Sequence, residues 1–290
     1  MRADLHIHSE NSFDGCDSVE NIIKQAKLAK IDVIAITDHN AVLLKNYSDS
    51  EIKVINGIEI DCYFGNKIIH LLGYGIDTTD IRYQKLHDNY YQELASIAIK
   101  RLRLIEKHFG CQLDLDKIKS LSSHDYFTNV EITKVLLSDI KHPDLEVYQT
   151  GKKANNPIAN FYWDNLAIGK WGYTAMTLPT YQKIISLIHE TKGVCICAHP
   201  FVNIGCDQAA INQLVAAGID GFEAYCSYHN EETSAFYQTI CEQKQLLYTC
   251  GSDYHGPTKP NIKLYDHHFK GDCNKMMKNL FMQMKHFSTK

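Results

Sequence analysis

Two histidines near the start of the chain have a spacing that lets one metal ion bind both. His6 and His8 belong to the run Asp4-Leu5-His6-Ile7-His8, in which polar and apolar residues alternate. Successive side chains of a β-strand point to opposite faces, so these two imidazoles project to the same side. A strand with two hydrogen-bonded, half-buried histidines would show the same short pattern. The spacing alone therefore leaves a metal site and a structural role both open.

Similar residues recur where later apolar runs end. Histidine, aspartate or glutamate stands at or just after an expected strand at Asp38-His39, Glu59, His70, His199, Glu223 and Asp253 to His255. In barrels of parallel strands joined by helices, the active site lies at the carboxyl ends of the strands. Gathering so many ionisable groups there without a metal or substrate would cost several kcal/mol. We therefore expect these residues to form one functional site at a barrel mouth.

The elements that must position these residues alternate between strands and helices. Strands are expected at 2–9, 32–37, 53–61, 67–73, 194–198, 221–225 and 246–250, and helices at 18–30, 181–191, 208–217 and 231–244. The nearly unbroken β-branched run 32–37 is typical of a strand buried on both faces of a parallel sheet. Ser18 suits the N-cap of the first helix. The order of elements predicts an α/β fold.

The strand–helix rhythm stops between residues 76 and 178. A long helix or helical pair is expected over 83–109, shorter helices over 114–121 and 130–139, and a loop-like segment over 141–174. We interpret 76–178 as a helical lobe inserted into a barrel domain made of 1–75 and 179–290. Arg101 and Arg103 are expected on the surface of the long helix. Five aromatic residues are expected in the lobe core, with stacking on a nucleobase as the alternative: Tyr126, Phe127, Phe161, Tyr162 and Trp163.

The composition is that of a globular chain. It has 290 residues, of which 44% are hydrophobic and 22% charged, and no apolar run approaches the roughly 18 to 20 residues that span a bilayer. No basic segment followed by an apolar signal region begins the chain. Ten scattered cysteines without a CxxC pair predict buried thiols in a reducing compartment. The net charge of −4 argues against long nucleic acid held on a basic surface. We expect a cytoplasmic protein without a membrane segment.

Taken together, the motifs resemble the PHP (polymerase and histidinol phosphatase) family of metal-dependent phosphoesterases. The resemblance is strongest to stand-alone members with a helical insert, a group that includes nucleoside 3′,5′-bisphosphate phosphatases and short-oligonucleotide 5′-exonucleases. It implies a distorted (β/α)7 TIM-like barrel that holds three divalent metal ions. The segments that carry it are His6-x-His8, Asp14, Thr37-Asp38-His39, Gly57-Ile58-Glu59, Ile69 to Gly75, Ala198-His199-Pro200 and Gly251 to Gly256.

The resemblance also implies which residues bind each ion. Imidazole and carboxylate ligands without thiolate suit zinc, manganese or iron, and the sequence does not choose among these. Asp38 would orient the site rather than bind an ion. The expected ligands are His6, His8, Glu59 and Asp253 for the first ion, Glu59 again with His70 and His199 for the second, and Asp14, His39 and His255 for the third.

The implied reaction is hydrolysis of a phosphate ester of a small phosphorylated molecule, with a nucleotide as the expected substrate. Bound ions make hydroxide available near neutral pH and can hold both the attacking and the leaving oxygen. His229 matches a family histidine and is expected to bind substrate or protonate the leaving oxygen, with a plain loop histidine as the alternative. Lys170 is expected to contact a phosphate, with a solvated surface lysine as the alternative.

Three other functions stay open at this point. The segment 126–131 lacks the Arg-Pro-His motif of the family's inserts. Histidinol phosphate is the alternative substrate, because members of the family hydrolyse it. A metal-dependent amidohydrolase is the alternative enzyme, because similar clusters on barrels cleave C–N bonds. A non-catalytic metal-binding module is the third alternative, against which the complete set of expected ligands argues.

Overall fold

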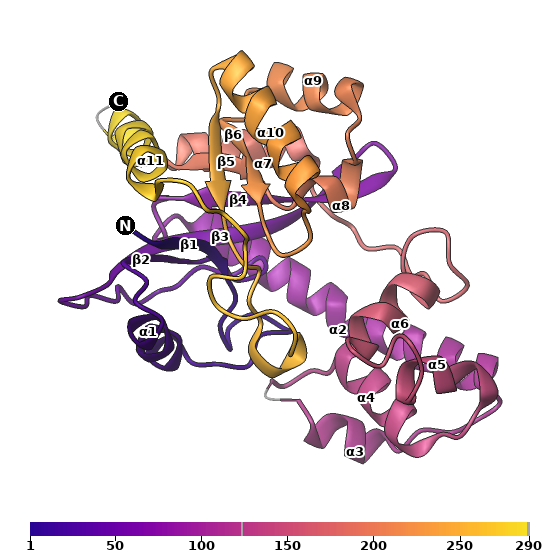
Figure 1. Cartoon of the computed structure of the whole chain (residues 1–290). Helices are drawn as coiled ribbons and strands as arrows, with labels where there is room; N and C mark the ends of the chain where they lie inside the picture. Colours follow the sequence, from indigo (N-terminus) through magenta and orange to yellow (C-terminus); the bar gives the residue numbers. More distant parts are fainter. Residues whose placement is uncertain (123, 289–290) are drawn as a thin grey trace. The chain divides into compact units, whose positions relative to one another are not determined.

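A computed structural model of the chain describes residues 1–122 and 124–288, which form two compact units (Figure 1). The first unit comprises Met1–His87, Leu178–Pro257 and Ile262–Lys290, and the second comprises Asp88–Thr177 and Thr258–Asn261. Each unit has a hydrophobic core of its own. All of the expected metal ligands belong to the first unit.

The first unit is built on a seven-stranded sheet in which the strands follow their sequence order. Strands β1, β2 and β3 pair in parallel, as do β5, β6 and β7, whereas β4 runs antiparallel to both of its neighbours. A parallel bridge between Ile7 and Tyr254 brings the first strand beside the segment after the last. This confirms the expected α/β barrel, and the reversed strand is its distortion. The strands are β1 (Ala3–Ile7), β2 (Val33–Ile36), β3 (Lys53–Phe64), β4 (Lys67–Tyr74), β5 (Val194–Cys197), β6 (Gly221–Tyr225) and β7 (Leu247–Cys250).

The helices of the first unit cover the outside and one end of the sheet. Helix α7 packs on β3, β4 and β5, α10 packs on β6 and β7, and α11 packs on β5 and β7. The sequence predicted α1, α7, α9 and α10, but not α8 or α11. The hydroxyl of Ser18 caps α1 as expected, since its oxygen accepts a hydrogen bond from the Asn21 N–H at 3.2 Å. The helices are α1 (Val19–Leu28), α7 (Tyr181–Glu190), α8 (Pro200–Ile204), α9 (Gln208–Ala216), α10 (Glu231–Lys244) and α11 (Cys273–Ser288).

Strand β2 shows why the sheet is stable with both faces covered. All four of its residues are buried. Ile34 and Ile36 pack in a cluster with α1, while Val33 and Ala35 pack in a second cluster with residues of α11. The two-residue period of a strand therefore sends alternate side chains into separate cores. A continuous apolar run is what such a strand requires.

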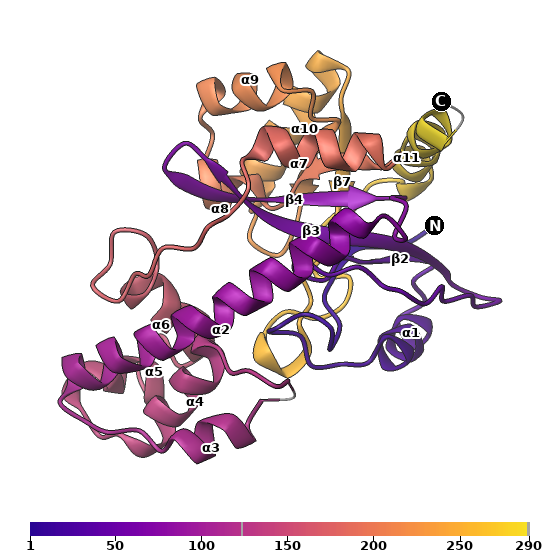
Figure 2. The ribbon, with the colours of Figure 1, turned by 180° about the vertical axis from the view of Figure 1, so that it is seen from behind.

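The second unit is helical, and α2 (Ile81–Phe109) enters it from the first unit (Figure 2). It also contains α3 (Leu115–Ser120), α4 (Asn129–Asp139), η1 (Pro143–Leu145), α5 (Glu146–Gln149) and α6 (Pro157–Asn165). The expected loop over 141–174 is wrong, since η1, α5 and α6 all lie in it. Pro157 occupies the first turn of α6, where a missing N–H costs nothing. Phe161 and Leu166 are fully buried, which gives this segment an apolar face.

The exposure of side chains in this unit corrects one expectation, for the arginines of the long helix, and refines another, for the aromatic residues. Arg101 is not on the surface: only 4% of it is exposed, and its Nη1 donates to Asn129 Oδ1 at 3.0 Å. Arg103 is exposed as expected. Phe127 and Phe161 belong to the core of the unit, whereas Trp163 is 51% exposed. Among the described helices, none is long and apolar enough to cross a membrane.

Candidate metal centre

The strands of the first unit bring nine histidine, aspartate and glutamate side chains to one place. His6 lies in β1 and His8 just after it, while His39, His199 and Asp253 follow the ends of β2, β5 and β7. Glu59 and His70 instead lie within β3 and β4, which pair as antiparallel neighbours. A bridge pairs His39 with Glu59. The nine are the residues that the sequence predicted as ligands: His6, His8, Asp14, His39, Glu59, His70, His199, Asp253 and His255.

Four donor atoms form the tightest group in this cluster. They are His6 Nε2, His8 Nε2, Glu59 Oε2 and Asp253 Oδ1, and neighbouring atoms are 3.1–3.2 Å apart. Donors about 2.0–2.1 Å from a tetrahedral ion lie about 3.3–3.4 Å from one another. The group therefore has the size and the chemical composition of a four-coordinate metal site, and it matches the ligand set expected for the first ion.

The Glu59 carboxylate faces two groups of donors at once. Its Oε2 belongs to the group just described, while its Oε1 lies 3.1 Å from His70 Nδ1 and 3.1 Å from His199 Nε2. Glu59 is fully buried, and its Oε2 makes no hydrogen bond to any described residue. Burial alone would raise the pKa of this carboxyl, but His6, His39 and His70 hold the pKa well below its usual range. An ionised, buried carboxylate in this position fits a bridge between two cations.

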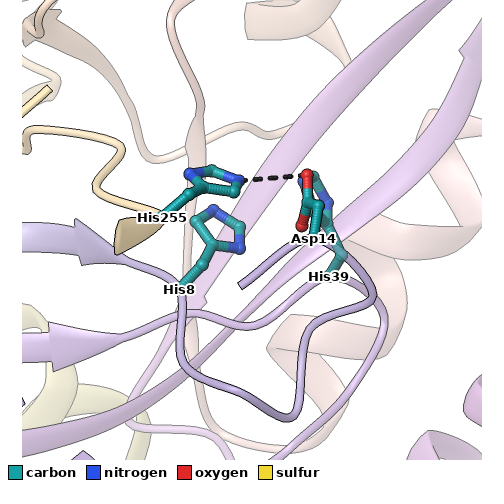
Figure 3. Close-up of side chains that lie close together, drawn as sticks. All are labelled: His8, Asp14, His39 and His255. Carbon is teal, nitrogen blue, oxygen red and sulfur yellow. Dashed lines mark ion pairs between the residues drawn. The ribbon is translucent and has the colours of Figure 1, made fainter. Parts of the chain in front are cut away.

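A third group surrounds Asp14 (Figure 3). Asp14 Oδ2 lies 3.2 Å from His255 Nε2 and 3.9 Å from His39 Nε2. The His8 ring stacks on His255 with ring centroids 3.9 Å apart. Burial, together with His255 and His39, lowers the pKa of His8 to about 4. The His8 ring is therefore neutral at pH 7 and has a lone pair to offer an ion.

Four of the histidines hold their second ring nitrogen against an acceptor. A neutral imidazole has one N–H and one lone pair, so an acceptor at one nitrogen leaves the lone pair on the other. This is the usual arrangement of metal-binding histidines. The acceptors are Glu223 Oε1 for His6 Nδ1 (3.1 Å), Ser12 Oγ for His8 Nδ1 (3.2 Å), Asn203 Oδ1 for His199 Nδ1 (3.1 Å) and the Asp253 carbonyl for His255 Nδ1 (2.8 Å).

Two ligand positions have backbones in the left-handed region. The φ angles of His199 and Asp253 are +25° and +59°. Such conformations cost about 1–3 kcal/mol each for residues other than glycine and are concentrated at functional sites. Gly251 also serves the site, because a Cβ atom there would lie 2.3 Å from His6 Cβ. Only glycine allows the end of β7 to approach β1 so closely.

Three site residues were not assigned roles from the sequence. Glu223 was expected only as a strand-end residue, yet its Oε2 also accepts from the His199 N–H at 2.7 Å. Tyr228 donates its hydroxyl to Asp253 Oδ2 at 2.5 Å, and no sequence pattern marks it. Asp61 lies 3.3 Å from His39 Nδ1. Its position two residues after Glu59 puts it on the same strand face, which is a signal that could have found it.

The other predicted functional residues lie outside this group of donors. Asp38 is buried and accepts from the Ser9 N–H at 2.6 Å and the Ser9 hydroxyl at 2.8 Å, so it fixes the start of the loop that carries Asp14. Burial raises the pKa of Asp38 to about 6. Its expected orienting role stays a prediction.

His229 and Lys170 also stay predictions. His229 is 2% exposed, its Nδ1 lies 2.9 Å from the Ala224 carbonyl, and its Nε2 lies 3.4 Å from the Phe201 amide nitrogen. This geometry makes Nδ1 the donor and leaves Nε2 as an acceptor. Lys170 is exposed and belongs to the second unit.

Comparison with known proteins identifies the family. The model of the PHP domain matches residues 4–271, almost the whole chain. The chain belongs to the PHP domain family. Membership makes it a metal-dependent phosphoesterase, which confirms the enzyme class expected from its motifs.

Three relatives of this PHP protein share about a quarter of its residues. The 5′-3′ exoribonuclease Rnm of Escherichia coli is 26% identical over 88% of this chain and 85% of its own length. The phosphoribosyl 1,2-cyclic phosphate 1,2-diphosphodiesterase of Eggerthella lenta is 24% identical over 88% of this chain and 95% of its own. The 3′,5′-nucleoside bisphosphate phosphatase of Chromobacterium violaceum is 23% identical over 88% of this chain and 87% of its own length.

Two solved structures share the fold of the PHP protein. A protein from Bifidobacterium adolescentis superposes with a TM-score of 0.76 at 18% identity, covering 98% of this chain and 96% of its own. A protein from Chromobacterium violaceum, called an amidohydrolase with bound sulfate and no metal, superposes with a TM-score of 0.75 at 20% identity, covering 98% of this chain and 97% of its own. At this level of identity the two structures support the fold alone.

Proposed function

We propose that this PHP protein hydrolyses the phosphate ester of a nucleotide, either a nucleoside 3′,5′-bisphosphate or the 5′ end of a short oligonucleotide. The observation that carries the proposal is the Glu59 carboxylate, which turns one oxygen to each of two donor groups. Two ions held by the two donor groups would suit phosphate hydrolysis, because such a pair can stabilise both the attacking and the leaving oxygen. The relatives support a nucleotide, because two of the three named above are called an exoribonuclease and a nucleoside bisphosphate phosphatase.

We propose three divalent ions as the cofactor, which the three donor groups support, with zinc, manganese and iron all compatible with the ligands. When bound, the ions would polarise the phosphoryl oxygens and lower the pKa of a water molecule. The chain itself holds the donors in place. Glu223 fixes the tautomer of His6, Asp38 anchors Ser9 ahead of Asp14, and Tyr228 orients the Asp253 carboxylate.

Two further residues are proposed to contact the substrate. Lys170 supplies a positive charge for a phosphate, and we expect Lys170→Ala to raise KM with kcat unchanged. His229 is proposed to bind substrate through Nε2 or to carry a proton to the leaving oxygen. For proton transfer, Nε2 must first exchange its contact with the Phe201 N–H for a proton.

The test is phosphate release by manganese-loaded protein. The substrates are adenosine 3′,5′-bisphosphate, AMP, a short 5′-phosphorylated RNA and histidinol phosphate. The double variant His6→Ala/His8→Ala removes two donors of the tightest group and should lose more than about 100-fold in rate, which corresponds to about 3 kcal/mol. His286→Ala, a change at an exposed histidine of α11, is the matched control and should retain full activity.

The substrate panel also separates the alternatives. Release from the bisphosphate or the RNA, lost in the double variant, supports the proposal. Release of phosphate from histidinol phosphate alone would mean that the substrate is an amino-acid precursor and not a nucleotide. No release from any of the four, with activity on amide substrates, would make this protein an amidohydrolase and overturn the proposal.

A further inference from the structure

Asp61 lies where ligand histidines of two different donor groups meet. Its side chain is buried, and its Oδ1 is 3.3 Å from His39 Nδ1 and 3.6 Å from His70 Nε2. Donor atoms of these three residues all lie within 4.8 Å of one another. Asp61 follows Glu59 on the same face of β3 and is paired in register with His70 of β4.

The valence of imidazole assigns a role to each nitrogen of His39 and His70. His39 turns Nε2 toward Asp14 in the third group, so its Nδ1 is left as the N–H that faces Asp61. His70 turns Nδ1 toward Glu59 Oε1, so its Nε2 is left as the N–H. Asp61 Oδ1 is a carboxylate oxygen that faces both of these N–H groups, at the distances given above. The other four histidines of the cluster show the same division between a ligand nitrogen and an acceptor-facing nitrogen.

Two competing assignments fit the contacts less well. Glu59 Oε2 is also 3.3 Å from His39 Nδ1, but the same oxygen lies 3.1–3.2 Å from the Nε2 atoms of His6 and His8. Its lone pairs are therefore directed at the first group. Direct binding of an ion by Asp61 together with His39 Nδ1 and His70 Nε2 would require both nitrogens of each ring to be ligands. That requires doubly deprotonated rings, which neutral imidazole does not provide.

We propose that Asp61 is a positioning residue of the metal centre, a single carboxylate that accepts the N–H groups of His39 and His70. It would thereby fix the tautomers of one ligand of the third ion and one ligand of the second. The inference rests on the metal centre of the proposed function but not on the identity of the substrate. Removing such an acceptor lowers metal affinity about 10- to 100-fold.

The test measures which nitrogen of each histidine ring carries the proton. Long-range ¹H–¹⁵N NMR spectra of zinc-loaded protein labelled at histidine distinguish Nδ1–H from Nε2–H rings. In the unmodified chain we expect His39 to carry its proton on Nδ1 and His70 on Nε2. In Asp61→Asn the acceptor loses its negative charge, and the amide can turn its NH2 group toward the two rings, so the two signals should shift or broaden. Asp116→Asn, an exposed aspartate of α3, is the matched control and should leave them unchanged.

Metal counting supplies a second readout that does not depend on hydrolysis. After zinc is removed, titration with manganese should show two sites weakened about 10- to 100-fold in Asp61→Asn, with the site at His6 and His8 unchanged. Loss of only one ion would make Asp61 a direct ligand and overturn the proposal, as would unchanged binding or protons on the opposite nitrogens. If Asp61→Asn does not fold, the spectrum of the unmodified chain still tests the proposal, because it shows which ring nitrogens of His39 and His70 carry the protons. A protein that shows this pattern without releasing phosphate would refute the proposed function alone.

Discussion

Glu223 makes the sharpest prediction, because one buried carboxylate serves two ligand residues. Its Oε1 lies 3.1 Å from His6 Nδ1, and its Oε2 accepts from the His199 N–H at 2.7 Å. Glutamine has nearly the same shape but only one acceptor oxygen. In Glu223→Gln, either the His6 ring or the His199 amide must therefore face an NH2 group in place of an oxygen.

The size of the effect can be worked out in two ways. A buried donor left without an acceptor costs about 1–3 kcal/mol. Loss of the acceptor behind a metal-binding histidine typically costs 10- to 100-fold in affinity or activity, which corresponds to about 1.4–2.7 kcal/mol. The two ranges agree, so we expect the tightest manganese site to weaken 10- to 100-fold in Glu223→Gln.

Calorimetric titration of chelator-treated protein with manganese measures this change. Glu231→Gln is the matched control, because Glu231 is exposed and pairs with Lys270 at 3.0 Å on the surface, where ion pairs contribute little. Circular dichroism establishes that both variants are folded. Unchanged affinity in Glu223→Gln, or an equal loss in the control, would refute the assignment of Glu223 as the acceptor that orients His6.

Three other predictions concern single contacts. Tyr228→Phe removes the hydroxyl that donates to Asp253 Oδ2 and should lower kcat about tenfold with metal content unchanged; an unaltered kcat would show that the contact has no role in turnover. Metal binding should release protons at pH 7 and weaken as the pH falls. Burial lowers the pKa of His39, but Glu59 and Asp14 raise it to about 10, so the metal-free ring carries a proton that an ion displaces; binding heats that do not depend on the buffer's ionisation enthalpy would contradict this. Thr128→Ala should lower the free energy of unfolding by about 1 kcal/mol, because it deletes one half of the capping box of α4; chemical denaturation followed by tryptophan fluorescence measures it, and an unchanged midpoint would show that the cap is not stabilising.

The sequence was most informative for site residues that lie in or next to a strand predicted from its own apolar residues. His6 and His199 stand beside unmistakable apolar runs, so strand periodicity and the geometry of barrels suffice to bring them together. Contacts that depend on a partner from another element were not predictable. Tyr228 precedes its helix in an unremarkable loop, and Arg101 has the spacing of a surface residue until Asn129 is placed against it.

The direction of β4 was missed although the sequence contained its signal. Gly65 and Asn66 alone separate β3 from β4, and Gly65 has a φ of +60°. Such a two-residue connection is typical of a hairpin and requires antiparallel strands. The expectation of a repeating strand–helix alternation obscured it. The reversal has a functional result, because it places His70 opposite Asp61 within the sheet rather than at a strand end.

The tightest donor group joins segments that are far apart in the sequence, since His6 lies in the first strand, His8 directly follows it and Asp253 follows the last strand. A ribosome must therefore synthesise the chain as far as Asp253 before these atoms can meet. Closing a loop of that length costs about 5 kcal/mol from the logarithmic term alone. We therefore expect metal to enter this group only after β7 has joined the sheet, so a truncated nascent chain that lacks β7 should be unable to hold an ion there.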